Sequence, residues 1–371
     1  MLLERQNANE IPAMLLPNWK TILNDLEKER AVLLIGPDFL SGQGRSVAAD
    51  FYIHLSDSLG TDATHFFERD GLFIFDTAVS KMDAQTEAET FYKNLALDEA
   101  VLKPIAELPF PLIVSVNPDL TLPQYFSKRQ INFQFDYFST KDKATPGNIT
   151  KPTAQTPLVY NLCGSIEDYQ SLVLDFDDMF DLLKNLLGDF GVPKVVNDHL
   201  VNATTYIFIG FEFDKWYTQL LLRYVNKNRD RFSNAKKNYA TKTIIGDEDT
   251  RTFFQQQFNL TIYGGDWQFL HDLHTEYAAA KKLRSLPDPI SDRAAVVRRL
   301  VQFNNIEAAL EQLEACAADL TAAERDELTM HKAGYHAWLS EYRDRTTTQE
   351  NLDVKIARIR KGILDLTQKL P

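Results

Sequence analysis

Short apolar runs alternate with longer amphipathic stretches from residue 19 to residue 284. A short apolar run bounded by turn residues predicts a strand buried in a parallel sheet. Such runs occupy residues 31–35, 110–116, 158–162, 206–209, 243–245 and 260–263, with weaker candidates at 133–138 and 171–174. Helical spacing of apolar residues predicts helices at 19–30, 45–59, 63–97, 176–187 and 214–226. The alternation predicts an α/β fold, with a doubly wound, mostly parallel sheet that carries helices on both faces.

Glycine or asparagine follows most of the predicted strands. The strand ends read Gly36-Pro-Asp, Asn117-Pro-Asp, Cys163-Gly164, Gly210-Phe211, Gly246-Asp247 and Gly264-Gly-Asp. Glycine lets the backbone approach a ligand closely, and ligands of open α/β sheets bind at the carboxyl ends of the strands. Several such turns on one predicted edge indicate a nucleotide-type cleft there.

The pattern changes after the sequence Leu286-Pro-Asp-Pro289, because two closely spaced prolines end the preceding helix. The rest of the chain has helical spacing, and its last segment repeats apolar residues at intervals of four and three: Leu352, Ile356, Ile359, Ile363, Leu366 and Leu370. We therefore expect two domains: an α/β domain at 1–284 and a small antiparallel helical bundle at 285–371.

Composition narrows the classes of function. The chain has 371 residues, 44% of them hydrophobic, a net charge of −12 and two cysteines. Two cysteines exclude a disulfide framework and a four-cysteine zinc site within one chain, and no run reaches the roughly 18 apolar residues of a membrane span. With no recognisable secretory signal, we expect a cytoplasmic protein with no membrane association. The acidic charge makes nucleic acid an unlikely partner.

The strand-end residues resemble those of sirtuin-like (silent-information-regulator-type) domains of the divergent prokaryotic kind. Ile35-Gly-Pro-Asp-Phe39 stands where that family has Gly-Ala-Gly-x-Ser, and Val116-Asn-Pro-Asp119 where it has Thr-x-Asn-x-Asp. Tyr160-Asn-Leu-Cys-Gly-Ser165 replaces Leu-His-Gly, and Ile209-Gly-Phe-Glu-Phe-Asp214 replaces the later Gly-x-Ser-x segment. The resemblance covers about residues 20–275 and implies a Rossmann-like domain.

This resemblance implies NAD, or a related adenine nucleotide, as the cofactor. The residues that it assigns to cofactor binding are Gly36, Pro37, Asp38, Phe39, Asn117, Asp119, Gly164, Gly210, Phe211, Asp214, Gly246 and Asp247. The family cleaves the bond between nicotinamide and ribose with an asparagine and a histidine, which correspond here to Asn117 and Cys163. Its protein deacylases also carry a four-cysteine zinc module, so the resemblance implies no zinc here and makes protein deacylation very unlikely.

Two departures from the family pattern bear on catalysis. Cys163 replaces the histidine: it acts either as a polarised thiolate or as a small apolar filler at a strand end, and the second interpretation is favoured. Pro37 lacks an N–H for phosphate and Asp38 adds negative charge, although Asp38 could bind ribose or cap a helix. Catalytic degradation is the leading hypothesis.

The helical tail resembles the effector-associated domains fused to such modules in bacterial anti-phage and other conflict systems. That resemblance implies a sensor or effector protein as the partner of the tail, and we also expect a homo-oligomer. Three functions stay open: a catalytically degraded nucleotide-binding or scaffold module, an NAD-depleting effector switched on by assembly, and a purely structural oligomerising subunit.

Overall fold

The computed structural model describes most of the chain. The described residues are 17–40, 46–60, 64–95, 99–139, 149–188, 192–226, 236–241, 248–263, 267–284, 293–302, 306–344 and 348–370. No described helix has both the length and the apolar composition needed to span a bilayer.

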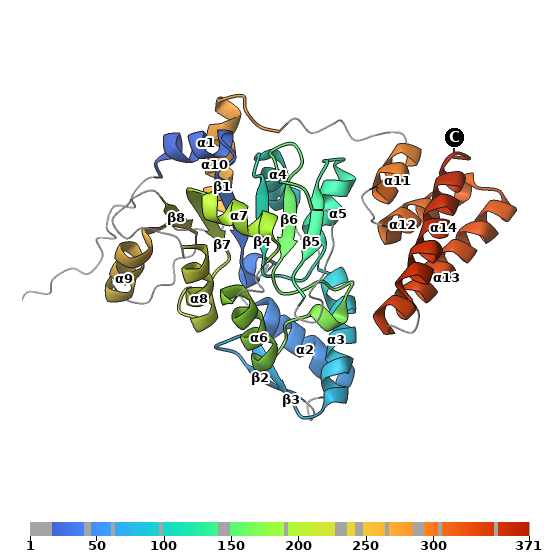
Figure 1. The fold of residues 1–371 in the computed structure, drawn as a ribbon, viewed down its shortest axis with the longest axis horizontal. Helices are drawn as coiled ribbons and strands as arrows, with labels where there is room; N and C mark the ends of the chain where they lie inside the picture. The colour runs from blue at the N-terminus through green and yellow to red at the C-terminus, as the bar shows by residue number, and fades with distance from the viewer. Residues whose placement is uncertain are drawn as a thin grey trace, which may run out of the picture.

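A seven-stranded parallel sheet forms the centre of the first domain (Figure 1). The strand order is β5-β6-β4-β1-β7-β8-β9, and every neighbouring pair is parallel. In chain order the strands are β1 (Ala31–Ile35), β4 (Leu112–Ser115), β5 (Gln134–Tyr137), β6 (Leu158–Asn161), β7 (Thr205–Ile209), β8 (Lys237–Ala240) and β9 (Leu260–Ile262). The sheet confirms the predicted doubly wound α/β fold.

The central strand β1 is the topological switch point of the sheet. It pairs with β4 on one side and β7 on the other, with Ile35 opposite both Ser115 and Ile209. The chain thus winds first toward β5 and then toward β9, and the loops after β1, β4 and β7 diverge at one edge. This is the place where open α/β sheets bind ligands.

Helices cover both faces of the sheet. The apolar side chains of β1 are accordingly buried on each face. Val32 and Leu34 belong to one buried cluster, and Leu33 and Ile35 belong to the other. The first cluster includes residues of α6 (Phe176–Leu187), α7 (Lys194–Asn202), α8 (Trp216–Val225) and α9 (Glu248–Phe258). The second includes residues of α1 (Trp19–Glu27), α4 (Glu99–Glu107), α5 (Thr121–Lys128) and α10 (Gln268–Ala279).

The segment predicted as one helical region at 63–97 is a hairpin followed by a helix, so that prediction was wrong in its first half. After α2 (Val47–Leu59), the strands β2 (Thr64–Phe67) and β3 (Leu72–Phe75) pair antiparallel, and α3 (Ala78–Lys93) follows. Phe66 lies opposite Phe73 with ring centroids 5.1 Å apart. Cross-strand aromatic pairs favour a hairpin over a helix. Gly71, with φ of +68°, supplies the left-handed turn residue.

Two smaller predictions also change. Residues 171–174 do not form a strand, because Tyr169–Ser171 is a short 3₁₀ helix and the segment after it is extended but unpaired within the sheet. The strand predicted at 243–245 lies outside the described residues, and β8 instead begins at Lys237. Its mixed composition had given no strand signal.

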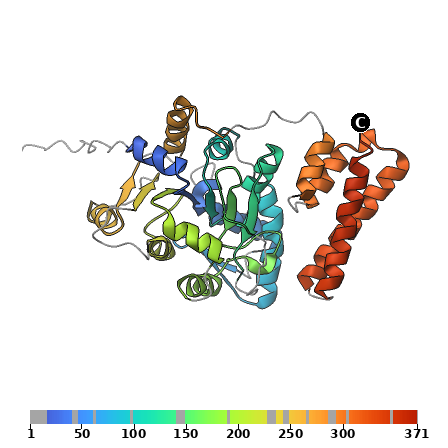
Figure 2. The same cartoon turned by 45° about the horizontal axis from the view of Figure 1, so that its top comes forward.

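The C-terminal helices α11 (Arg293–Gln302), α12 (Ile306–Ala315), α13 (Ala322–Asp344) and α14 (Gln349–Thr367) pack together. The first five residues of the predicted repeat, from Leu352 to Leu366, are buried. The Trp338 indole N–H donates to the Leu352 carbonyl, and Lys369 pairs with Glu327, so α13 and α14 are antiparallel. Figures 1 and 2 show these helices beside the sheet domain, where α11 contacts α5.

Arg284 is the last described residue before the helical bundle, and its side chain anchors the chain to the sheet domain. Its guanidinium donates to the carbonyl oxygens of Ala106, Phe110 and Ala154, which precede β4 and β6. Burial lowers the pKa of Arg284 to about 10. The chain therefore leaves the sheet domain from the amino-terminal edge of the strands. The domain boundary at 284/285 stays a prediction.

Candidate functional site

A cavity of about 100 Å³ lies at the carboxyl edge of the sheet. Four of the residues expected at a cofactor site line it: Pro37 after β1, Asn117 after β4, Cys163 after β6 and Phe211 after β7. Because these strands are parallel and in register, their ends meet at one edge, as the sequence predicts.

The glycines that follow β1 and β7 let the loops after these two strands contact each other closely. A Cβ atom on Gly36 would lie 2.2 Å from the Gly210 carbonyl oxygen, and one on Gly210 would lie 2.5 Å from the Phe39 nitrogen. Gly210 also has a φ of +70°. Both positions require glycine because the two backbones touch, so neither glycine leaves open space for a ligand.

The backbone N–H groups of residues 36–39, called here the β1 loop, already have acceptors within the protein. Gly36 donates to the Ile209 carbonyl (2.7 Å), Asp38 to the Gly210 carbonyl (3.1 Å) and Phe39 to the Gly36 carbonyl (3.2 Å). Pro37 has no N–H to donate. A phosphate cradle needs several N–H groups that point at the ligand. Among the described residues of the loop, residues 36–39 therefore offer no free N–H group to a pyrophosphate.

Asn117 combines a place in the cavity with a structural role. Its side-chain amide donates to the Gly36 carbonyl oxygen (2.9 Å), and its backbone N–H donates to the Ser115 hydroxyl (3.0 Å). The side chain is buried. The amide thus joins the ends of β4 and β1, and its carbonyl oxygen is the part that remains for other contacts.

Cys163 is a buried, neutral thiol. Its exposed fraction is 8%, and burial raises its pKa to about 12. Burial thus favours the protonated thiol, which is a poor general base and a poor nucleophile. Cys163 packs in the same apolar cluster as Leu162 and Met179. These observations favour the interpretation of Cys163 as an apolar filler.

The other expected site residues lie away from the cavity lining. Phe39 is buried on the opposite face of the sheet against Trp267, with ring centroids 4.8 Å apart. Asp119 accepts from the Thr121 N–H (2.8 Å) at the start of α5, and burial raises the pKa of this carboxyl. Gly164 packs against the Ser171 carbonyl, and Asp214 is exposed. Gly246 and Asp247 lie outside the described residues.

Sequence reasoning missed the polar residues of the cavity that lie on α8. Lys215 precedes the first residue of this helix, and Thr218 lies in its first turn; both line the cavity. The sequence did carry a signal for them, since a lysine follows directly on the strand-end segment Gly210–Asp214. The apolar wall of α6, which includes Met179, Leu182 and Leu186, was predicted as an amphipathic helix but not as part of a site.

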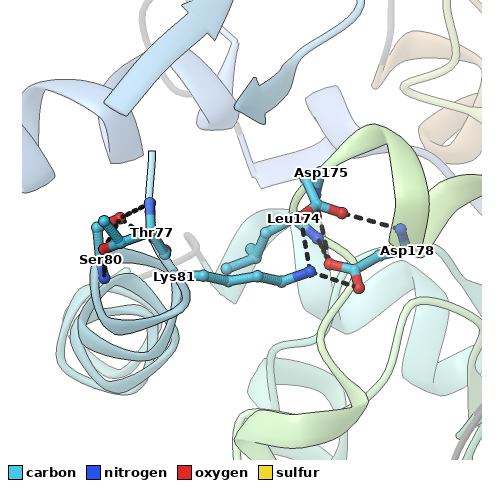
Figure 3. A network of polar contacts seen from close by, with 6 residues as sticks. All are labelled: Thr77, Ser80, Lys81, Leu174, Asp175 and Asp178. Carbon is cyan, nitrogen blue, oxygen red and sulfur yellow. Dashed lines mark hydrogen bonds and ion pairs between the residues drawn. The ribbon is translucent and has the colours of Figure 1, made fainter. Parts of the chain in front are cut away.

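An ion-pair cluster holds α6 in place beside the cavity (Figure 3). Lys81 of α3 donates to Asp175 (2.6 Å) and Asp178 (2.7 Å), and each aspartate also caps the start of α6. Burial opposes the charge of Lys81, but its hydrogen bonds to the two aspartates raise its pKa. Asp175 and Asp178 therefore cap the start of α6. Among the described residues, no group of side chains is suited to hold a metal ion.

Comparison with known families identifies both parts of the chain. Residues 111–262 match the SIR2-like domain, and residues 292–371 match effector-associated domain 11. The first match contains Asn117, Cys163 and Gly210 but begins after the β1 loop. A search of curated proteins gives no significant match. SIR2-like domains typically bind NAD. Residues 36–39 of this chain offer no free N–H group to the pyrophosphate of NAD. The chain thus joins a SIR2-like domain to a C-terminal effector-associated domain 11.

Proposed function

We propose that this protein is a component of a bacterial conflict system in which the SIR2-like domain has lost NAD hydrolysis. The observation that carries the proposal is Cys163, which occupies the position of the histidine that the family uses as general base. A thiol with a pKa of about 12 cannot replace an imidazole in that role. The domain then serves as a ligand-binding or scaffold module, and the C-terminal domain recruits a protein partner.

The β1 loop supports the same proposal. The N–H groups of residues 36–39 bond to the β7 loop and to the loop itself, so this part of the loop offers none of them to a phosphate. The cavity that remains is small and bordered mostly by apolar side chains. Such a cavity suits a compact ligand better than a dinucleotide.

Nicotinamide release from NAD tests this proposal. Purified wild-type protein, Cys163→His and Asn117→Ala are incubated with NAD, and circular dichroism confirms that each variant is folded. We expect no release by the wild type. Release that disappears in Asn117→Ala would overturn the proposal and identify an active effector. Release by Cys163→His alone would support it, because it would locate the lost step at this side chain.

Activation by assembly is the second candidate, and the position of Asn117 in the cavity favours it. In this case the protein hydrolyses NAD only as an oligomer or with its partner. The same assay on size-exclusion fractions separates the two candidates: release confined to a high-mass fraction would favour the assembled effector. A high-mass fraction without release would favour a scaffold.

A further inference from the structure

Two helix N-termini meet at one end of the cavity. Ser46, Val47 and Ala48 at the start of α2 line it, as do Lys215 and Thr218 at the start of α8. The turn at Gly71 lies between them: a Cβ atom there would be 3.4 Å from the Ala48 Cβ and 3.5 Å from the Lys215 Nζ. Helix N-termini carry partial positive charge, so this end of the cavity favours an anion.

Lys215 adds a full positive charge at the same end. Its side chain is 6% exposed, and its ammonium contacts the Glu212 carboxylate at 3.0 Å. An ammonium has three N–H donors, and burial makes each unused donor costly. Glu212 is more exposed than Lys215 and lies three residues before it, in the segment that precedes α8. The pair leaves donor capacity on Lys215 that a ligand in the cavity can use.

Thr218 provides an independent sign of a ligand. Its hydroxyl has no hydrogen-bond partner among the described residues, although the residue is only 2% exposed. Unpartnered buried hydroxyls are rare because losing water without a replacement costs free energy. Since Thr218 lines the cavity beside Lys215, a bound acceptor atom would satisfy it.

The rest of the cavity is apolar. Leu162, Leu174, Met179, Leu182, Leu186 and Leu221 form this part of the wall. Cys163 is also there and stays uncharged. An apolar wall favours a hydrocarbon group, because burying it releases about 25 cal/mol per Å² of surface. The volume of about 100 Å³ admits a group smaller than the benzene that fills a cavity of about 150 Å³.

We propose that the cavity binds a small amphipathic anion, with a carboxylate or phosphate head at Lys215 and Thr218 and a short hydrocarbon body against α6. The proposal rests on the SIR2-like domain being a ligand-binding module and names the class of ligand. It assigns Lys215 as the counter-ion of the head group and Thr218 as a hydrogen-bond donor to it.

Calorimetric titration of the full-length protein with four probes tests the proposal. Butanoate and butyl phosphate carry both parts of the expected ligand, butan-1-ol lacks the charge and acetate lacks the hydrocarbon body. We expect at least one of the first two to bind about tenfold more tightly than butan-1-ol and acetate, a difference of about 1.4 kcal/mol. The tighter of the two identifies the head group.

Variants link the binding to the named side chains. Lys215→Met is expected to reduce the affinity for the anion to that for butan-1-ol, and Thr218→Val to weaken it severalfold. Glu212→Gln is expected to strengthen it, because it removes the competing carboxylate. Lys184→Met is the control, since Lys184 is an exposed lysine of α6 that does not line the cavity.

Equal affinity for butanoate, butyl phosphate and butan-1-ol would overturn the proposal, and so would anion binding that Lys215→Met leaves unchanged while the variant remains folded. Should Lys215→Met not fold, the opposite response of Glu212→Gln decides: weaker or unchanged binding in that variant would overturn it. A failure of the anions to bind would not change the outcome of the nicotinamide-release assay. An absence of anion binding without nicotinamide release removes only this inference, whereas nicotinamide release removes the proposed function.

Discussion

The Asn117 side-chain amide donates a hydrogen bond of 2.9 Å to the Gly36 carbonyl oxygen and so joins the ends of β4 and β1. An asparagine expected to act on a substrate is thereby also part of the framework. Loss of activity in an Asn117 variant would not by itself identify a catalytic role, because the variant also breaks a buried hydrogen bond.

We therefore expect Asn117→Ala to lower the free energy of unfolding by about 1–3 kcal/mol, since it leaves the buried Gly36 carbonyl without this donor. Urea denaturation followed by circular dichroism measures the change. Asn94→Ala is the control: Asn94 is exposed, its side-chain amide donates to the Thr90 carbonyl, and the loss of this bond should cost less than about 0.5 kcal/mol. Equal effects of the two substitutions would contradict the framework role.

The contact between the β1 and β7 loops predicts a severe effect of Gly36→Ala. The new methyl group would overlap the Gly210 carbonyl oxygen, and only a separation of the strand ends would relieve it. We expect a loss of about 3 kcal/mol or more, visible as a lower melting temperature or insoluble protein. Gly334→Ala in α13 makes the same chemical change with only ordinary contacts to Ile359 and should be neutral or slightly stabilising. A stable Gly36→Ala protein would show that the loops can separate.

The ion-pair cluster of Figure 3 predicts coupling between α3 and α6. Lys81→Met removes the cation from between Asp175 and Asp178, and we expect a loss of about 1–3 kcal/mol. Adding Asp178→Asn to the Lys81→Met variant should restore part of the lost stability, because one of the two facing carboxylates is then neutral. A double-mutant cycle measures this coupling. Strict additivity of the two substitutions would mean that the ion pairs contribute nothing to stability.

We expect the free energy of unfolding to depend on pH because of the buried carboxyl group of Asp136. This carboxyl group is 6% exposed, one of its oxygens has no hydrogen-bond partner among the described residues, and burial raises its pKa to about 6. The folded protein thus holds a proton that the unfolded chain releases near its ordinary value of 3.8. Stability contributed by this group is greatest below that value and falls as the pH rises toward 6.

Asp136→Asn should remove this dependence and raise the free energy of unfolding at pH 7.5 by on the order of 1–3 kcal/mol. The difference between variant and wild type, measured from pH 4 to 7.5, isolates Asp136 from the other carboxylates. A difference that stays constant over this range would show that Asp136 titrates at its ordinary value.

The sequence predicts the central strands of the sheet well because they are short apolar runs that end in Gly or Asn, and such runs have few alternatives when both faces are buried. It fails at β8, whose mixed composition gives no strand signal. It also fails at the β2–β3 hairpin, whose aromatic residues fit a helix pattern until Phe66 is seen opposite Phe73. The site was predicted in part. Strand ends place Asn117 and Cys163 at one edge, but the Gly36–Gly210 contact, the orientation of Lys215 and the wall formed by α6 depend on packing between distant segments.

Arg284 and the cavity lie at opposite edges of the sheet. Its guanidinium holds the chain at the amino-terminal edge of β4 and β6, while the cavity opens at the carboxyl edge of the same strands. The described part of the sheet domain therefore ends at the edge opposite the cavity, so this end of the domain does not obstruct the entry of a ligand. The contact of α11 with α5 connects the C-terminal helices to the sheet domain by a second path.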